Sequence, residues 1–125
     1  MEYDGNDIYN SDIKLVKAEA FALRIINLHK YLRKRGERVM SKQTLRCGTS
    51  IGANIAESIY AESKEDLIHK LSISLKEASE TNYWLRLLMK GGYISSQQYQ
   101  SISKDCHEML KILTSILRKL KARKE

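Results

Sequence analysis

The sequence contains no proline, two cysteines, and only one phenylalanine and one tryptophan among 125 residues. Proline is the strongest breaker of helices, and its absence removes that interruption from the whole chain. The residues that are abundant, among them leucine, isoleucine, lysine, glutamate and alanine, favour helices over strands. The composition therefore predicts an all-α protein.

Other absences limit the class of protein further. Two cysteines cannot form a disulfide framework, and no apolar run approaches the roughly 20 residues that span a bilayer. Residues 1–15 are acidic and polar and lack the basic and apolar regions of a signal peptide. We therefore expect a cytoplasmic protein that does not contact membranes. Its length suits one domain, and its net charge is +7, from 22 Lys and Arg against 15 Asp and Glu.

Capping residues and glycines divide the chain into four helical segments, at residues 11–35, 41–61, 63–90 and 95–123. Ser95 and Gln98 form a capping box, and Gly91 and Gly92 before them end the preceding helix. Ser63 caps the third segment. Because the gaps are short, neighbouring helices should run antiparallel, as in an up-down-up-down four-helix bundle. We expect this bundle to span residues 11–125, with residues 1–10 as a flexible arm.

The helices differ in how many apolar faces they have. The last segment has one apolar seam, typical of a bundle core: Tyr99, Ile102, Cys106, Met109, Leu113, Ile116 and Leu120. The first and third segments each have a second apolar stripe, which needs a partner outside the bundle. We therefore predict a homo-oligomer whose interface comprises Val16, Ala20, Leu23, Tyr31, Ile73, Trp84 and Leu88. A monomer with scattered apolar surface residues is the alternative.

Gly48, Gly52 and Ala56 follow one another at four-residue spacing in the second segment. Glycine inside a helix costs roughly 1 kcal/mol relative to alanine, and close approach of another helix is the simplest compensation. A phosphate-binding glycine loop is disfavoured, because it would need a preceding strand and a lysine.

Two motifs of the sequence resemble those of a known family. Gly48 to Glu57 (GTSIGANIAE) and Lys76 to Leu85 (KEASETNYWL), with Gln43 and Arg46 ahead of the first, resemble bacterial four-helix-bundle proteins encoded in intervening sequences of large-subunit ribosomal RNA genes. The likeness extends from about Lys17 to Leu120, and Ser58 departs from it where many relatives have Gly or Ala.

The resemblance implies an antiparallel four-helix bundle that assembles into a ring, with a pentamer favoured. The family is also similar in fold to the accessory variability protein of diversity-generating retroelements, a basic pentameric barrel that binds its reverse transcriptase and nucleic acid. The resemblance does not settle a biochemical role.

One end of the predicted bundle gathers cations. We call this end the basic pole and define it by Lys30, Arg33, Lys34, Arg35, Arg38, Lys42, Arg46 and Lys90. Such a surface attracts phosphate backbones, so we predict nucleic-acid binding there, with Glu37 as the nearest opposing charge. The alternative is a solvated helix end whose cations complement the helix dipoles. Tyr31 and Tyr93 lie near this pole and either stack on bases or pack in the core or interface.

The opposite pole contains Asp4, Asp7, Asp12, Glu57, Glu62, Glu65 and Asp66, and the basic tail from Arg118 to Lys124 ends there. The tail either binds phosphate weakly or partners this acidic pole; the sequence does not favour one reading over the other.

No catalytic or metal site is expected. His29, His69 and His107 form no pair at metal-ligand spacing, and neither cysteine has a CxxC partner. Glu57 and Glu80 have no nucleophile and no orienting group at a spacing that catalysis would need. Hydrogen bonding is therefore the default role for these and the other polar residues of the two motifs. We therefore predict a non-enzyme without metal or cofactor. The leading hypothesis is binding of RNA or other nucleic acid, and the alternative is an accessory scaffold that docks a larger enzyme such as a reverse transcriptase.

Overall fold

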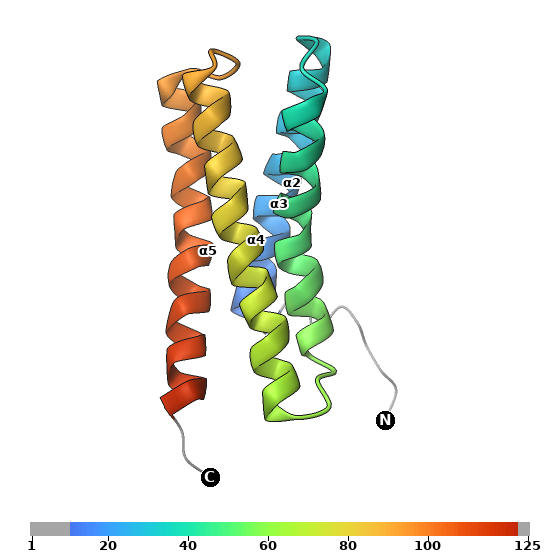
Figure 1. Ribbon diagram of the computed structural model, residues 1–125, viewed down its shortest axis with the longest axis vertical. Helices are drawn as coiled ribbons and strands as arrows, with labels where there is room; N and C mark the ends of the chain where they lie inside the picture. The colour runs from blue at the N-terminus through green and yellow to red at the C-terminus, as the bar shows by residue number, and fades with distance from the viewer. Residues whose placement is uncertain (1–10, 123–125) are drawn as a thin grey trace.

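The structure is a computed structural model that describes residues 11–122. Within this range the chain forms four helices: α2 (Ile13–Lys34), α3 (Val39–Ser58), α4 (Lys64–Lys90) and α5 (Ser96–Ala122). They run alternately up and down, so that the α2–α3 and α4–α5 turns lie at one end of the bundle and the α3–α4 turn lies at the other (Figure 1). The prediction of an all-α four-helix bundle is confirmed. The predicted arm, residues 1–10, lies outside the described residues.

Most helix ends follow the predicted capping chemistry. The Ser63 Oγ accepts a hydrogen bond from the Asp66 backbone N–H at 3.0 Å. In the capping box, the Ser95 N–H donates to Gln98 Oε1 at 2.7 Å and the Gln98 N–H donates to Ser95 Oγ at 3.0 Å. Of the two glycines before this box, only Gly92 has a positive φ, of 84°. The cap that ends α4 therefore needs one left-handed glycine and not two.

The predicted bounds of α3, 41–61, are wrong at both ends. The helix begins at Val39, because the Glu37 carboxylate accepts the backbone N–H groups of Val39, Met40 and Ser41 at 3.2, 3.0 and 2.6 Å. It ends at Ser58, and the following residues form tighter turns with bonds between residues three apart.

The core is apolar and forms two clusters. The larger contains Leu15, Ala18, Phe21, Ile25, Ile51, Ile55, Leu71, Ala78, Leu85, Ile102, Cys106, Met109, Leu113 and Leu117. The smaller contains Leu32, Leu88 and Ile94. Both cysteines are buried and free, and burial raises the pKa of the Cys106 thiol to about 12. One buried polar group is satisfied across helices, since the Ser74 hydroxyl donates to the Ile51 carbonyl at 2.8 Å.

The glycines of α3 lie against α2, as predicted. A Cβ at Gly48 would be 2.9 Å from both γ-carbons of Ile25, and a Cβ at Gly52 would be 3.3 Å from the Cβ of Ala18. The missing side chains therefore allow the two helices to approach closely, and this packing positions the end of α2 beside the start of α3.

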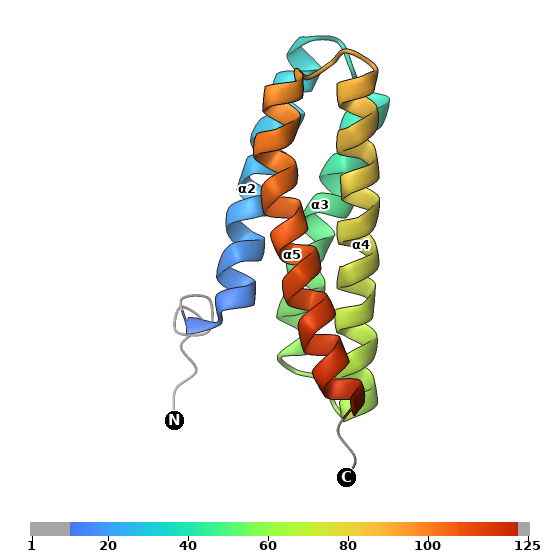
Figure 2. The same cartoon turned by 90° about the vertical axis from the view of Figure 1, so that its left-hand side faces the viewer.

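The fourth side of the bundle, between α2 and α5, is the least tightly packed of the four helix pairs. Figure 2 shows α2 and α5 diverging away from the α2–α3 turn. Polar bridges join them: Lys17 to Glu108 at 3.0 Å, and Arg24 to Asp105 at 2.7 Å. No described helix has the length and apolar character that crossing a membrane requires.

Candidate nucleic-acid interface

The basic pole forms at the end of the bundle where α2 ends, α3 begins, α4 ends and α5 begins (Figure 1). Lys30, Arg33 and Lys34 lie in the last turns of α2, Arg38 precedes α3, and Lys90 ends α4. The helix dipole favours those cations of the pole that lie at the C-termini of α2 and α4. The antiparallel fold therefore brings residues from three helices to one end.

The eight predicted cations are all exposed, but their charges are not equally free. Seven of them form no ion pair within residues 11–122. The exception is Arg46, whose guanidinium contacts Glu77 at 3.2 Å and Glu80 at 2.5 Å. Arg46 lies two turns into α3, where it links α3 to α4. Its charge is thus locally neutralised, and the free cations of the pole are the other seven.

Glu80 is the centre of this small network on the α3–α4 face. The Trp84 indole N–H donates to its carboxylate at 3.0 Å, and Arg46 donates to the same oxygen. These two hydrogen bonds, first that of Trp84 and then that of Arg46, hold the pKa of Glu80 below its usual value. A carboxylate held ionised by two donors is suited to joining two helices and not to accepting a proton in catalysis.

Glu37, expected as the opposing charge of the basic pole, is turned inward. Its side chain is 7% exposed and accepts the three N–H groups at the start of α3. Its negative charge therefore stabilises the N-terminus of α3 and is not exposed at the surface. The outer surface of the pole consequently has cations that no carboxylate within the described residues neutralises.

Tyr31 lies at the edge of the pole with Arg35 one turn later. The Arg35 guanidinium donates to the Tyr31 hydroxyl at 2.6 Å, and its central carbon is 5.4 Å from the ring centroid. This hydrogen bond, and after it the nearby Gln98 side chain of α5, lower the pKa of Tyr31. The second predicted tyrosine, Tyr93, is half-buried and packs against Leu32 and its neighbours. Of the two, Tyr31 is the one with an accessible ring.

The residues predicted for an oligomer interface differ in how exposed the structure leaves them. Val16, Ala20 and Leu23 lie exposed along one side of α2, and Leu23 is 56% exposed. Ile73 and Trp84 are half-buried on α4. Leu88, however, is 0% exposed and packs with Leu32 and Ile94 inside the chain. Its assignment to the interface is wrong, because the α4–α5 turn folds Ile94 over it.

Two further polar residues of the sequence motifs, Glu57 and Asn54, form bonds within the chain. Glu57 pairs with Lys70 at 3.4 Å, and Asn54 donates to the Ser50 carbonyl and hydroxyl of its own helix. Glu57 and Glu80 thus have separate partners. No group of three or more potential metal ligands occurs in the part of the chain that the structure describes.

The basic tail is described only in part. Arg118, Lys119 and Lys121 are exposed at the end of α5, while Arg123 and Lys124 lie outside the described residues. None of the three described cations forms an ion pair with a described carboxylate. The structure therefore shows no pairing of this part of the tail with the acidic pole.

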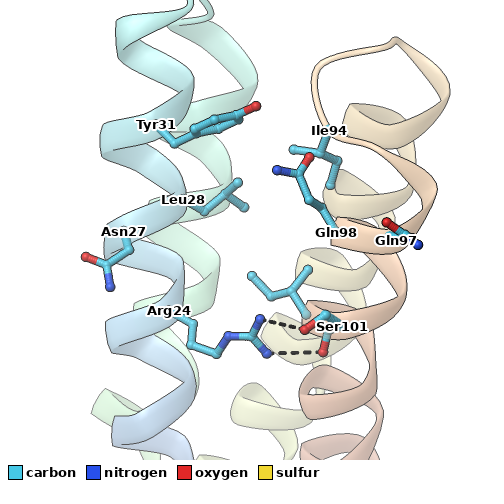
Figure 3. Close-up of a pocket in the computed structure, with 9 residues that line it drawn as sticks. Arg24, Asn27, Leu28, Tyr31, Ile94, Gln97, Gln98 and Ser101 are labelled. Carbon is cyan, nitrogen blue, oxygen red and sulfur yellow. Dashed lines mark hydrogen bonds between the residues drawn. The ribbon is translucent and has the colours of Figure 1, made fainter.

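Sequence reasoning did not find a groove between α2 and α5 that opens beside the basic pole. We call it the α2–α5 groove; its volume is about 470 Å³, and it is lined by Arg24, Asn27, Leu28, Tyr31, Ile94, Gln97, Gln98, Ser101 and Ile102 (Figure 3). Helix periodicity places residues on faces but does not give the separation between two helices. The groove therefore had no signal in the sequence.

These features define a class: a four-helix bundle with a basic end formed by three of its helices. More particularly, the chain belongs to the 23S rRNA-intervening sequence protein family, whose sequence profile matches residues 13–115. It is also similar to a crystal structure of a protein with unknown function from the S23 ribosomal protein family of Bacteroides thetaiotaomicron VPI-5482. The two are 53% identical, with a TM-score of 0.82 over 83% of this chain and 97% of the other. No protein with a curated description matches the chain.

Proposed function

We propose that the protein is a non-catalytic, cytoplasmic binding protein for RNA or other nucleic acid, and that it uses the basic pole. The observation that supports this most is the group of seven exposed cations that form no ion pair with a carboxylate among residues 11–122, next to the single inward-turned carboxylate of Glu37. Cations whose charge no carboxylate offsets are available to replace the counterions of a phosphate backbone. Binding of this kind depends on charge and discriminates little between sequences.

Reversal of the pole's charge tests this proposal. Replacing Arg33, Lys34, Arg35 and Arg38 with Glu should abolish retention of labelled RNA at low salt, because the phosphates then meet like charge. Replacing the same four with Gln should weaken retention strongly and avoids placing acids at the end of α2. Helicity by circular dichroism should stay unchanged for the Gln variant.

A matched control reverses four exposed cations on the sides of the bundle, namely Lys76, Arg86, Lys104 and Lys111. This control has the same net charge as the Glu variant of the pole, so it separates local from overall charge. Retention that falls equally in the control and in that Glu variant contradicts a site at the pole. Retention unchanged in the pole variants favours the alternative role as a scaffold for a larger enzyme.

We also propose that copies of the chain assemble into a ring, with five copies as the favoured number. The exposed stripe on α2 and the half-buried Ile73 and Trp84 on α4 support this, because α2 and α4 are diagonally opposite in the bundle. Two different apolar patches on opposite sides pair head to tail, and a head-to-tail contact closes into a ring when the rotation permits.

Sedimentation velocity tests the assembly. We expect a mass several times the 14.4 kDa of one chain at micromolar concentration. Leu23→Glu should shift the protein toward the monomer, because it places a charge in the apolar stripe, while the control Gln100→Glu on α5 should leave the mass unchanged. A mass near one chain for the unmodified protein contradicts the ring.

A further inference from the structure

The α2–α5 groove has apolar walls and polar ends. Leu28 from α2 faces Ile94 and Ile102 from the other side, and the latter two are buried. At the end next to the basic pole, the Tyr31 ring extends from α2 toward the Gln98 amide (Figure 3). At the other end, Arg24 donates to the Ser101 carbonyl at 3.1 Å and to its hydroxyl at 2.9 Å. This bridge closes the groove away from the pole.

We propose that this groove binds one unpaired base of a single-stranded nucleic acid, so the inference rests on the proposed function and names its substrate class. A base has two apolar faces and a polar edge, which matches apolar walls with polar groups at the ends. The volume of about 470 Å³ falls in the range of roughly 300–1,000 Å³ typical of pockets for small ligands.

The position of the groove supports a nucleic acid over another occupant. Lys30 and Lys34 on α2, and Arg35 directly after it, lie within about one turn of Tyr31 and form no ion pair within the described residues. When the phosphates of a single-stranded nucleic acid contact these cations, its bases lie beside the mouth of the groove, because the cations are next to Tyr31. Accessible tyrosine rings stack on bases of any identity, and stacking requires a base that is not already paired.

The groove excludes a duplex for a geometric reason. Its volume of about 470 Å³, between two helices joined by the Arg24 bridge, is that of a small-ligand pocket and too small to hold a double helix. We therefore expect single strands to bind more tightly than duplexes of the same length. The phosphate contacts alone would favour the duplex, whose charge density is higher.

Fluorescence anisotropy with three labelled probes tests the groove. The probes are a twelve-nucleotide oligoadenylate RNA, a strand of the same length with all of its bases removed, and the oligoadenylate paired with oligouridylate. We expect the unmodified protein to bind the complete single strand roughly tenfold more tightly than the abasic strand, the size of one stacked base. Tyr31→Ala and Ser101→Trp should each remove this difference, the first by deleting the ring and the second by filling the groove.

Tyr83→Ala is the matched control, since Tyr83 is an exposed tyrosine on α4 and does not line the groove. It should keep the tenfold preference. Tyr31→Phe should also keep most of it, because the ring remains.

The outcomes separate this inference from the function on which it rests. Equal, steeply salt-dependent binding of the complete and abasic strands overturns the groove as a base site and leaves binding by the pole intact. Absence of binding to all three probes overturns the proposed function and the groove with it. An unchanged preference in Tyr31→Ala, together with a smaller sedimenting mass, means that a second copy of the chain occupies the groove and overturns the inference.

Discussion

At the scale of single residues, Glu37 determines both where α3 begins and which charges the pole presents. Its carboxylate accepts three consecutive backbone N–H groups, the closest at 2.6 Å, and only 7% of the residue is exposed. These bonds satisfy donors that a helix start otherwise leaves to water. Because the same charge is withdrawn from the surface, the neighbouring cations keep their charge available for a ligand.

Glu37→Ala should lower the free energy of unfolding by about 1–2 kcal/mol, as loss of a helix cap does. Urea denaturation measures this. Glu19→Ala, which removes an exposed glutamate from the middle of α2, is the control and should change the stability by less than about 0.5 kcal/mol. Equal effects of the two substitutions would show that Glu37 does not cap α3 in solution.

This cap also explains why the prediction from the sequence placed the start of α3 two residues too late. Ser41 is a residue type typical of N-caps, so the pattern predicted a start there. In the structure Ser41 is already in the helix, and its hydroxyl lies 2.8 Å from the His29 ring nitrogen of α2. A glutamate two residues before the helix is not a usual cap signal, and its role depends on the chain folding back onto the helix start.

At the scale of elements, the contact between α2 and α3 is set by side-chain size. Ile25 and Ala18 of α2 lie directly opposite Gly48 and Gly52 of α3. Ile25 is branched at Cβ and fully buried, so it has little freedom to move away from a new atom. The four-residue spacing of the glycines indicated this close approach, and the structure identifies the residues that it accommodates.

Gly48→Ala should destabilise the protein by about 1–2 kcal/mol, because overpacking against Ile25 exceeds the gain in helix propensity. Gly52→Ala, with a milder contact at 3.3 Å, should have a smaller effect and is the paired comparison. Thermal or urea unfolding distinguishes them. A stabilised Gly48→Ala variant would mean that α2 and α3 are further apart than the structure places them.

Some features of the helices could be predicted from the sequence and others could not. The capping box and single seam of α5 predicted its start and its core face, because both depend on residues close together in the chain. The groove beside α5 depends instead on how α3 and α4 hold α2 away from α5. Leu88 was misassigned for the same reason, since a helix face does not reveal that Ile94 covers it.

At the scale of the whole molecule, the basic pole is where exposed cations from three helices lie together. Arg46, Arg24, Lys17 and Lys70 are neutralised in bridges between helices, where they contribute to the bundle. The other cations of the basic pole form no ion pair with a described carboxylate and remain on the surface. A phosphate backbone is the ligand whose charge and extent match such a surface, which is why the proposed function places it there.

The salt dependence of RNA affinity tests binding at this pole most directly. For nuclease-treated protein and the labelled oligoadenylate, we expect the logarithm of the association constant to fall linearly with the logarithm of salt concentration. The slope should correspond to several released counterions, at roughly 0.7 for each phosphate of a single strand. Replacing Arg33, Lys34, Arg35 and Arg38 with Gln should flatten that slope. An affinity that stays constant between low and moderate salt would contradict binding through the basic pole.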